Sequence, residues 1–84
     1  MIYSHLPGPP QIIDFPLGGK GYKYIVADPE RKRVVVMENA TENRRQGFRE
    51  LAEMNETNLY MLPPFFQEYT RKCWERWGLY DQKD

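Results

Sequence analysis

The residues best suited to nucleophilic or acid–base chemistry are one histidine, His5, and one cysteine, Cys73. A catalytic histidine needs an orienting partner and a substrate proton or a nucleophile within reach, and nothing around His5 supplies either. Cys73 lies in an apolar stripe, where a free cysteine is usually a small buried hydrophobe. One histidine and one cysteine also exclude the usual zinc sites. We therefore expect a protein that is not an enzyme and that holds no metal and no cofactor.

The glycine-rich segment 17–21 (LGGKG) superficially resembles a phosphate-binding loop. It lacks the glycine spacing that precedes Gly-Lys in such loops and the Ser or Thr that follows the lysine. It also leads into a predicted strand, whereas phosphate is normally held at the N-terminus of a helix. The segment is better interpreted as a hinge, and no small-molecule substrate is evident.

Three clusters of basic residues raise the possibility of nucleic-acid binding, with neighbouring aromatic rings as stacking platforms. The chain has twelve basic and twelve acidic residues, so it lacks the basic excess that is typical of such proteins. Nucleic acid is therefore the alternative partner, not the leading one. In that alternative the contacts would come from Arg31, Lys32, Arg33, Arg44 and Arg45.

Aromatic side chains exceed what one small domain can bury, since they make up 14% of only 84 residues. Exposed aromatic patches with arginine nearby mark protein interfaces. We therefore predict a non-catalytic protein–protein interaction module that binds another protein or a second copy of itself. A core built around Phe48, Phe65, Phe66, Tyr69, Trp74 and Trp77 is expected. The predicted partner-binding residues are Ile12, Ile13, Phe15, Tyr60, Arg71 and Trp74.

By analogy, small proteins with apolar arms often serve as viral assembly components or as inhibitors of host proteins. A homo-oligomeric structural subunit is a further alternative.

The chain has no run of 18 apolar residues and no signal-peptide pattern at its N-terminus. We therefore expect no membrane association and a cytoplasmic location, which for a viral product means the host cytoplasm or the particle.

The elements that must position these residues begin with an extended Pro- and Gly-rich arm over 1–21. An α+β domain over 22–80 follows, and 81–84 form a polar tail. Within the domain, 22–37 predict an antiparallel hairpin whose turn contains Asp28 and Pro29. The run Val34, Val35, Val36 lacks polar alternation, so its strand should be covered on both faces.

Two helices are predicted after the hairpin. The first spans 41–54 on the strength of a capping box and a thin apolar stripe, and the second spans 64–77 after a Pro-Pro pair. The predicted fold class is therefore α+β: an antiparallel hairpin of two or three strands packed against two α-helices, preceded by the arm. A strand from the arm is the candidate third strand.

Overall fold

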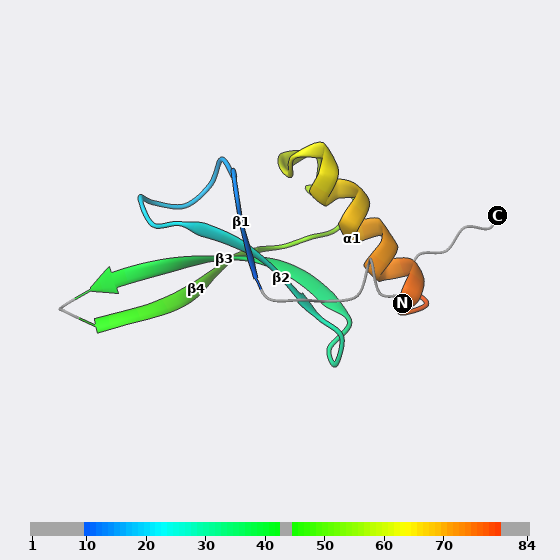
Figure 1. Ribbon diagram of the computed structural model, residues 1–84, viewed down its shortest axis with the longest axis horizontal. Helices are drawn as coiled ribbons and strands as arrows, with labels where there is room; N and C mark the ends of the chain where they lie inside the picture. Colours follow the sequence, from blue (N-terminus) through cyan, green and yellow to red (C-terminus); the bar gives the residue numbers. More distant parts are fainter. Residues whose placement is uncertain (1–9, 43–44, 80–84) are drawn as a thin grey trace.

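A computed structural model describes residues 10–42 and 45–79, and the side chains among them except those of 41–46. In this part of the chain, four strands form one antiparallel sheet in the order β1-β2-β3-β4 (Figure 1). Each strand therefore pairs with its neighbour in sequence. The elements are β1 (Gln11–Ile13), β2 (Lys23–Asp28), β3 (Arg33–Glu42), β4 (Arg45–Glu53), the 3-10 turn η1 (Leu59–Met61) and α1 (Pro64–Arg76).

The predicted fold class is wrong in its strands and helices, because the described residues form four strands and a single α-helix with a 3-10 turn. The predicted helix over 41–54 does not form. Those residues continue β3 and then make β4, which pairs with β3 along its length. This pairing supplies hydrogen-bond partners for the backbone N–H and C=O groups of β4, and it places Leu51 and Ala52 against the core. A helix over 41–54 would have only a thin apolar stripe, so it would have buried less apolar surface.

The turn between β2 and β3 follows the pattern that Asp28 and Pro29 predict. Asp28 Oδ1 accepts hydrogen bonds from the backbone N–H groups of Glu30 and Arg31 at 3.1 and 3.2 Å. The Arg31 guanidinium also donates to Asp28 Oδ2 at 3.2 Å. The backbone hydrogen bond from Arg31 is the main reason that the pKa of Asp28 lies below its ordinary value. An aspartate in this position closes a hairpin turn locally.

The antiparallel register divides the side chains between two faces of the sheet, because residues paired across strands point to the same side. Ile25, Val36 and Ala52 form one such row, and Ile12, Tyr24 and Met37 form a row on the opposite side. The first face carries the core. There Ile25, Val34 and Val36 pack with Leu59 and Leu62 around η1 and with Cys73 and Trp74 of α1.

The core includes part of the segment that was expected to form an extended arm. Ile13 and Phe15 are buried in it and belong to the same cluster as Trp74. Phe48 and Phe65 were expected in the core, but the structure leaves 64% and 68% of them exposed. Phe48 is exposed because β4 is a strand, which turns it away from α1. The exposed ring of Phe65 lies in the first turn of α1.

Helix α1 begins at Pro64, where a proline costs little because the first N–H groups of a helix have no partner within it. It ends at Arg76, and just beyond it Gly78 has a φ of +76°, the left-handed conformation that favours glycine after a helix end. Figure 1 shows α1 at one end of the molecule and the β3–β4 hairpin extending toward the other. Within residues 10–42 and 45–79, no helix has the length and apolar character needed to cross a bilayer.

Candidate functional site

The face of the sheet opposite the core is also apolar. We call it the open face, because the α-helix of the described residues packs on the other side. The register brings together rows from four strands: Ile12 with Tyr24 and Met37, Val26 with Val35, and Asn39 with Phe48. Ile12 and Phe48 are exposed. The open face therefore consists of Ile12, Tyr24, Val26, Val35, Met37 and Phe48.

A groove of about 560 Å³ runs over the open face and is lined by most of its members, and also by two prolines and by the charged side chains of Asp28 and Arg33. Tyr24 and Phe48 form one wall, where their rings meet edge to face with centroids 5.8 Å apart. Val35 lies beneath and is only 3% exposed. An antiparallel sheet with one wet face normally alternates apolar and polar residues along each strand. The apolar run along β3 breaks that rule, as is typical of a strand covered on both sides.

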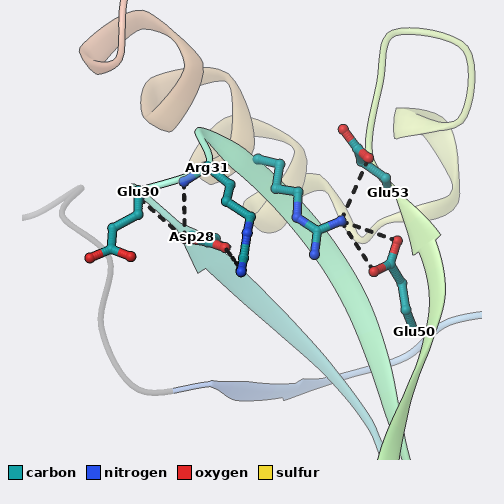
Figure 2. A network of polar contacts seen from close by, with 6 residues as sticks. Asp28, Glu30, Arg31, Glu50 and Glu53 are labelled. Atoms are coloured by element: carbon teal, nitrogen blue, oxygen red, sulfur yellow. Dashed lines mark hydrogen bonds and ion pairs between the residues drawn. The ribbon is translucent and has the colours of Figure 1, made fainter.

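Charged residues border the groove on the β4 side. Arg33 Nη1 lies 3.2 Å from Glu50 Oε1 and 3.8 Å from Glu53 Oε1. Figure 2 shows both carboxylates turned toward the same guanidinium group. Two carboxylates thus share one cation, and a negative charge remains on this border. The Arg33 Nε atom is buried and has no hydrogen-bond partner among the described residues.

A second polar cluster lies on the core side of the sheet, around Glu38. This carboxylate is only 2% exposed. It accepts hydrogen bonds from Arg49 Nη2 at 2.9 Å and from the Gly21 backbone N–H at 2.9 Å, and Lys23 Nζ lies 3.9 Å away. The Lys23 ammonium in turn donates to the Gly19 carbonyl. The glycine segment that resembles a phosphate loop therefore directs its N–H groups at a carboxylate of its own chain, and it has a structural role.

Hydrogen bonds from the backbone of Gly19 and from the Arg49 side chain hold the pKa of Glu38 below its ordinary value. A lowered folded-state pKa stabilises the protein above the ordinary pKa of a glutamate, and that contribution disappears as the pH falls through the folded-state pKa. We expect the free energy of unfolding to fall on acidification below about pH 4.5, the unfolded value. In Glu38→Gln this acid dependence should be shallower, and the variant should be less stable at neutral pH.

Urea unfolding of both chains between pH 3 and pH 7 measures this difference. Asp28 also has a lowered pKa, so Asp28→Asn, in an exposed turn, should likewise make the acid dependence shallower. If Glu38→Gln and the unaltered chain lose stability in parallel on acidification, Glu38 does not contribute as the structure indicates.

The structure separates the predicted partner-binding residues. Ile12 belongs to the open face, whereas Ile13, Phe15 and Trp74 are buried in the core. Tyr60 is 73% exposed in η1, on a different part of the molecule. Arg71 lies on α1, 4.0 Å from Glu56. These six residues therefore do not form one surface, and a partner could reach only some of them.

The basic residues of the nucleic-acid alternative are likewise divided. Arg31 is paired with Asp28, and Arg33 is held between Glu50 and Glu53. Lys32 is exposed at the tip of the turn. Arg44 and the side chain of Arg45 lie outside the described residues.

Sequence reasoning did not select Val35, Met37 or Phe48 as functional residues and considered Tyr24 only as a stacking platform for nucleic acid, although the unbroken apolar run from Val34 was the available signal. Burial raises the pKa of the Cys73 thiol, which disfavours the reactive thiolate. His5 lies outside the described residues.

No protein family, curated protein or solved structure matches this chain at a significant level.

Proposed function

We propose that the chain is a non-catalytic protein-binding module that docks a protein partner on the open face. One observation carries this proposal: β3 is apolar on both sides, but the core covers one side, and the other forms an apolar groove. Burying such a surface against a partner releases about 25 cal/mol per Å² of apolar area.

The composition of the open face also supports docking. Aromatic residues and methionine are enriched at the centres of protein interfaces, and charged residues are more common at their rims. Here Tyr24, Met37 and Phe48 occupy the groove, while Glu50 and Glu53 lie at its border. Phe48 and its edge-to-face neighbour Tyr24 offer the type of anchor that dominates binding energy in many interfaces.

A photo-cross-linking amino acid placed at position 48 tests this proposal, and the same substitution at position 65 is the matched control. Phe48 and Phe65 are exposed to a similar degree, 64% and 68%, but they lie on different surfaces. In cells of the source organism, position 48 should give a discrete protein adduct, and position 65 should give little. Adduct formation in the reverse order, or equally from both positions, would contradict docking on the open face.

The same experiment addresses the two alternatives. An adduct with nucleic acid would favour the nucleic-acid interpretation, which the ion-paired state of Arg31 and Arg33 supports less well. An adduct with a second copy of the chain would favour the homo-oligomeric subunit.

A further inference from the structure

The apolar floor and the acidic border of the open face together indicate what kind of partner it receives. We propose that the open face binds an amphipathic helix of another protein, whose apolar stripe lies on Tyr24, Met37 and Phe48 and whose lysine or arginine side chains lie opposite Glu50 and Glu53. This inference rests on the proposed function and specifies its partner.

The backbone of the sheet favours a helix over an extended segment. The N–H and C=O groups of β3 pair with β2 and β4, and those of β2 pair with β3 and, over 23–25, also with β1, so that one side of 26–28 is a sheet edge. An extended segment lying on the open face would find no backbone partners there, whereas a helix satisfies its own backbone groups. The face therefore suits a partner that brings side chains only, as α1 does on the opposite side.

Strand addition at a sheet edge is the competing mode, and among the described residues the edge strands are β1, which has only three residues, and β4. Its pairing with β3 contains a register shift at Val36 and Met37, and its exposed residues include Arg49, Glu50 and Glu53. Bulges and charged side chains are the features by which natural proteins prevent pairing at sheet edges. The open face is thus the more suitable surface.

The dimensions of the open face suit a short helix. Val35 and Asn39 mark its two ends along β3, and four residues of strand span about 13 Å. At about 5.4 Å per turn, that distance corresponds to two or three turns of helix. Leucine-sized residues at helical spacing would then follow the apolar rows of β2 and β3.

The charge on the border favours a basic partner over a second copy of this chain. Glu50 pairs across the sheet with Met37, in the middle of the open face, so a partner covering Met37 also approaches Glu50. Within the described part of the chain, Arg33 is the one cation paired with Glu50 and Glu53. Two copies packed face to face would bring two such uncompensated charges into one poorly solvated interface, which is unfavourable. A cationic side chain from a different protein would compensate the charge.

Synthetic peptides of about four helical turns provide the probes. One contains leucine and lysine with the leucines at helical spacing, a second replaces lysine with glutamate, and a third has the leucine–lysine composition in scrambled order. Fluorescence anisotropy of each labelled peptide with the full chain gives the affinities. We expect the patterned leucine–lysine peptide to bind at least about tenfold more tightly than either of the others.

Charge removal on the border supplies the second measurement. Glu50→Gln with Glu53→Gln should weaken binding of the leucine–lysine peptide about three- to tenfold, the range expected for two partly exposed ion pairs. The matched control is Glu68→Gln with Glu75→Gln on α1, two exposed glutamates away from the groove, and it should bind unchanged. Thermal melting of each variant verifies that it is folded.

The outcomes separate this inference from the proposed function. The inference that the partner is a basic helix is overturned if the leucine–lysine peptide does not bind. It is also overturned if the glutamate peptide or the scrambled peptide binds equally well. The proposed function then still stands if cross-linking from position 48 identifies a protein partner. A dimer in sedimentation that Phe48→Ser disrupts and Phe65→Ser does not would overturn the inference in favour of a second copy. Peptide binding that Phe48→Ser leaves unchanged would overturn the inference, because the peptide would then not lie on the open face.

Discussion

Replacing Gly21 with alanine should destabilise the protein by about 3 kcal/mol, a large part of the stability of a domain this size. A Cβ atom at this position would lie 1.9 Å from the Asn39 carbonyl oxygen, which is backbone and cannot move independently. The loop would have to withdraw from β3. That movement would lengthen the hydrogen bond from Gly21 N–H to Glu38 and the one from Tyr22 N–H to Asn39 Oδ1, now 2.9 and 2.7 Å.

Urea unfolding followed by circular dichroism measures this effect, and Gly47→Ala is its matched control. Gly47 lies within β4, and a Cβ added there meets no atom within 4 Å. Because glycine weakens the interior of a strand, alanine at 47 should be neutral or stabilise by up to about 1 kcal/mol. If the two variants unfold at the same urea concentration, the close approach of the loop to β3 is not a constraint on stability.

Replacing Trp74 with alanine should cost about 3–5 kcal/mol, the usual range for removing a large aromatic side chain from a core. Trp74 is only 8% exposed and packs among the buried residues between α1 and the sheet. Removing the indole leaves a cavity that the surrounding strands cannot close, because their positions are fixed by pairing.

The thermal midpoint of Trp74→Ala should therefore fall sharply, and that of Tyr60→Ala should change little. Tyr60 is 73% exposed, and exposed substitutions usually change stability by less than about 0.5 kcal/mol. A Trp74→Ala chain that melts like the unaltered protein would show that the core does not depend on this ring. For the same reason, a loss of partner binding in Trp74→Ala would reflect unfolding and would not identify Trp74 as a contact.

The elements that depend on local chemistry were predictable from the sequence. Asp28 and Pro29 encode their turn because the aspartate hydrogen-bonds within four residues of itself. The structure has α1 over Pro64–Arg76, where the prolines and the apolar spacing predict a helix over 64–77. In both cases the partner groups are close in sequence, so the pattern alone contains the information.

Strand β4 was not predictable in the same way, because its stability comes from β3 and its own sequence favours a helix. Glutamate, arginine, leucine and alanine are good helix formers, and they fill this segment. The register shift opposite Val36 and Met37 also lets Leu51 and Ala52, adjacent in sequence, both pack against the core. That arrangement disrupts the alternation by which a strand is recognised.

The open face was predictable in part. The run Val34, Val35, Val36 predicts a strand covered on both sides, and this prediction needs the sequence alone. The arrangement of Phe48 beside Tyr24, and of Glu50 and Glu53 around Arg33, required the pairing of β4 with β3. Because 41–54 was predicted to be a helix, the open face was not recognised, although the apolar residues at its centre were noted.

The Glu38 carboxylate has a consequence for how the molecule opens. It joins three segments, since its hydrogen bonds and ion pairs come from the glycine loop, from Lys23 at the start of β2 and from Arg49 on β4. Detaching any one of them leaves a buried charge with fewer partners, which raises the cost of a partial opening. The hairpin that extends from the body and the loop at its base are therefore expected to fluctuate as one cooperative unit, so that neither frays while the other stays closed.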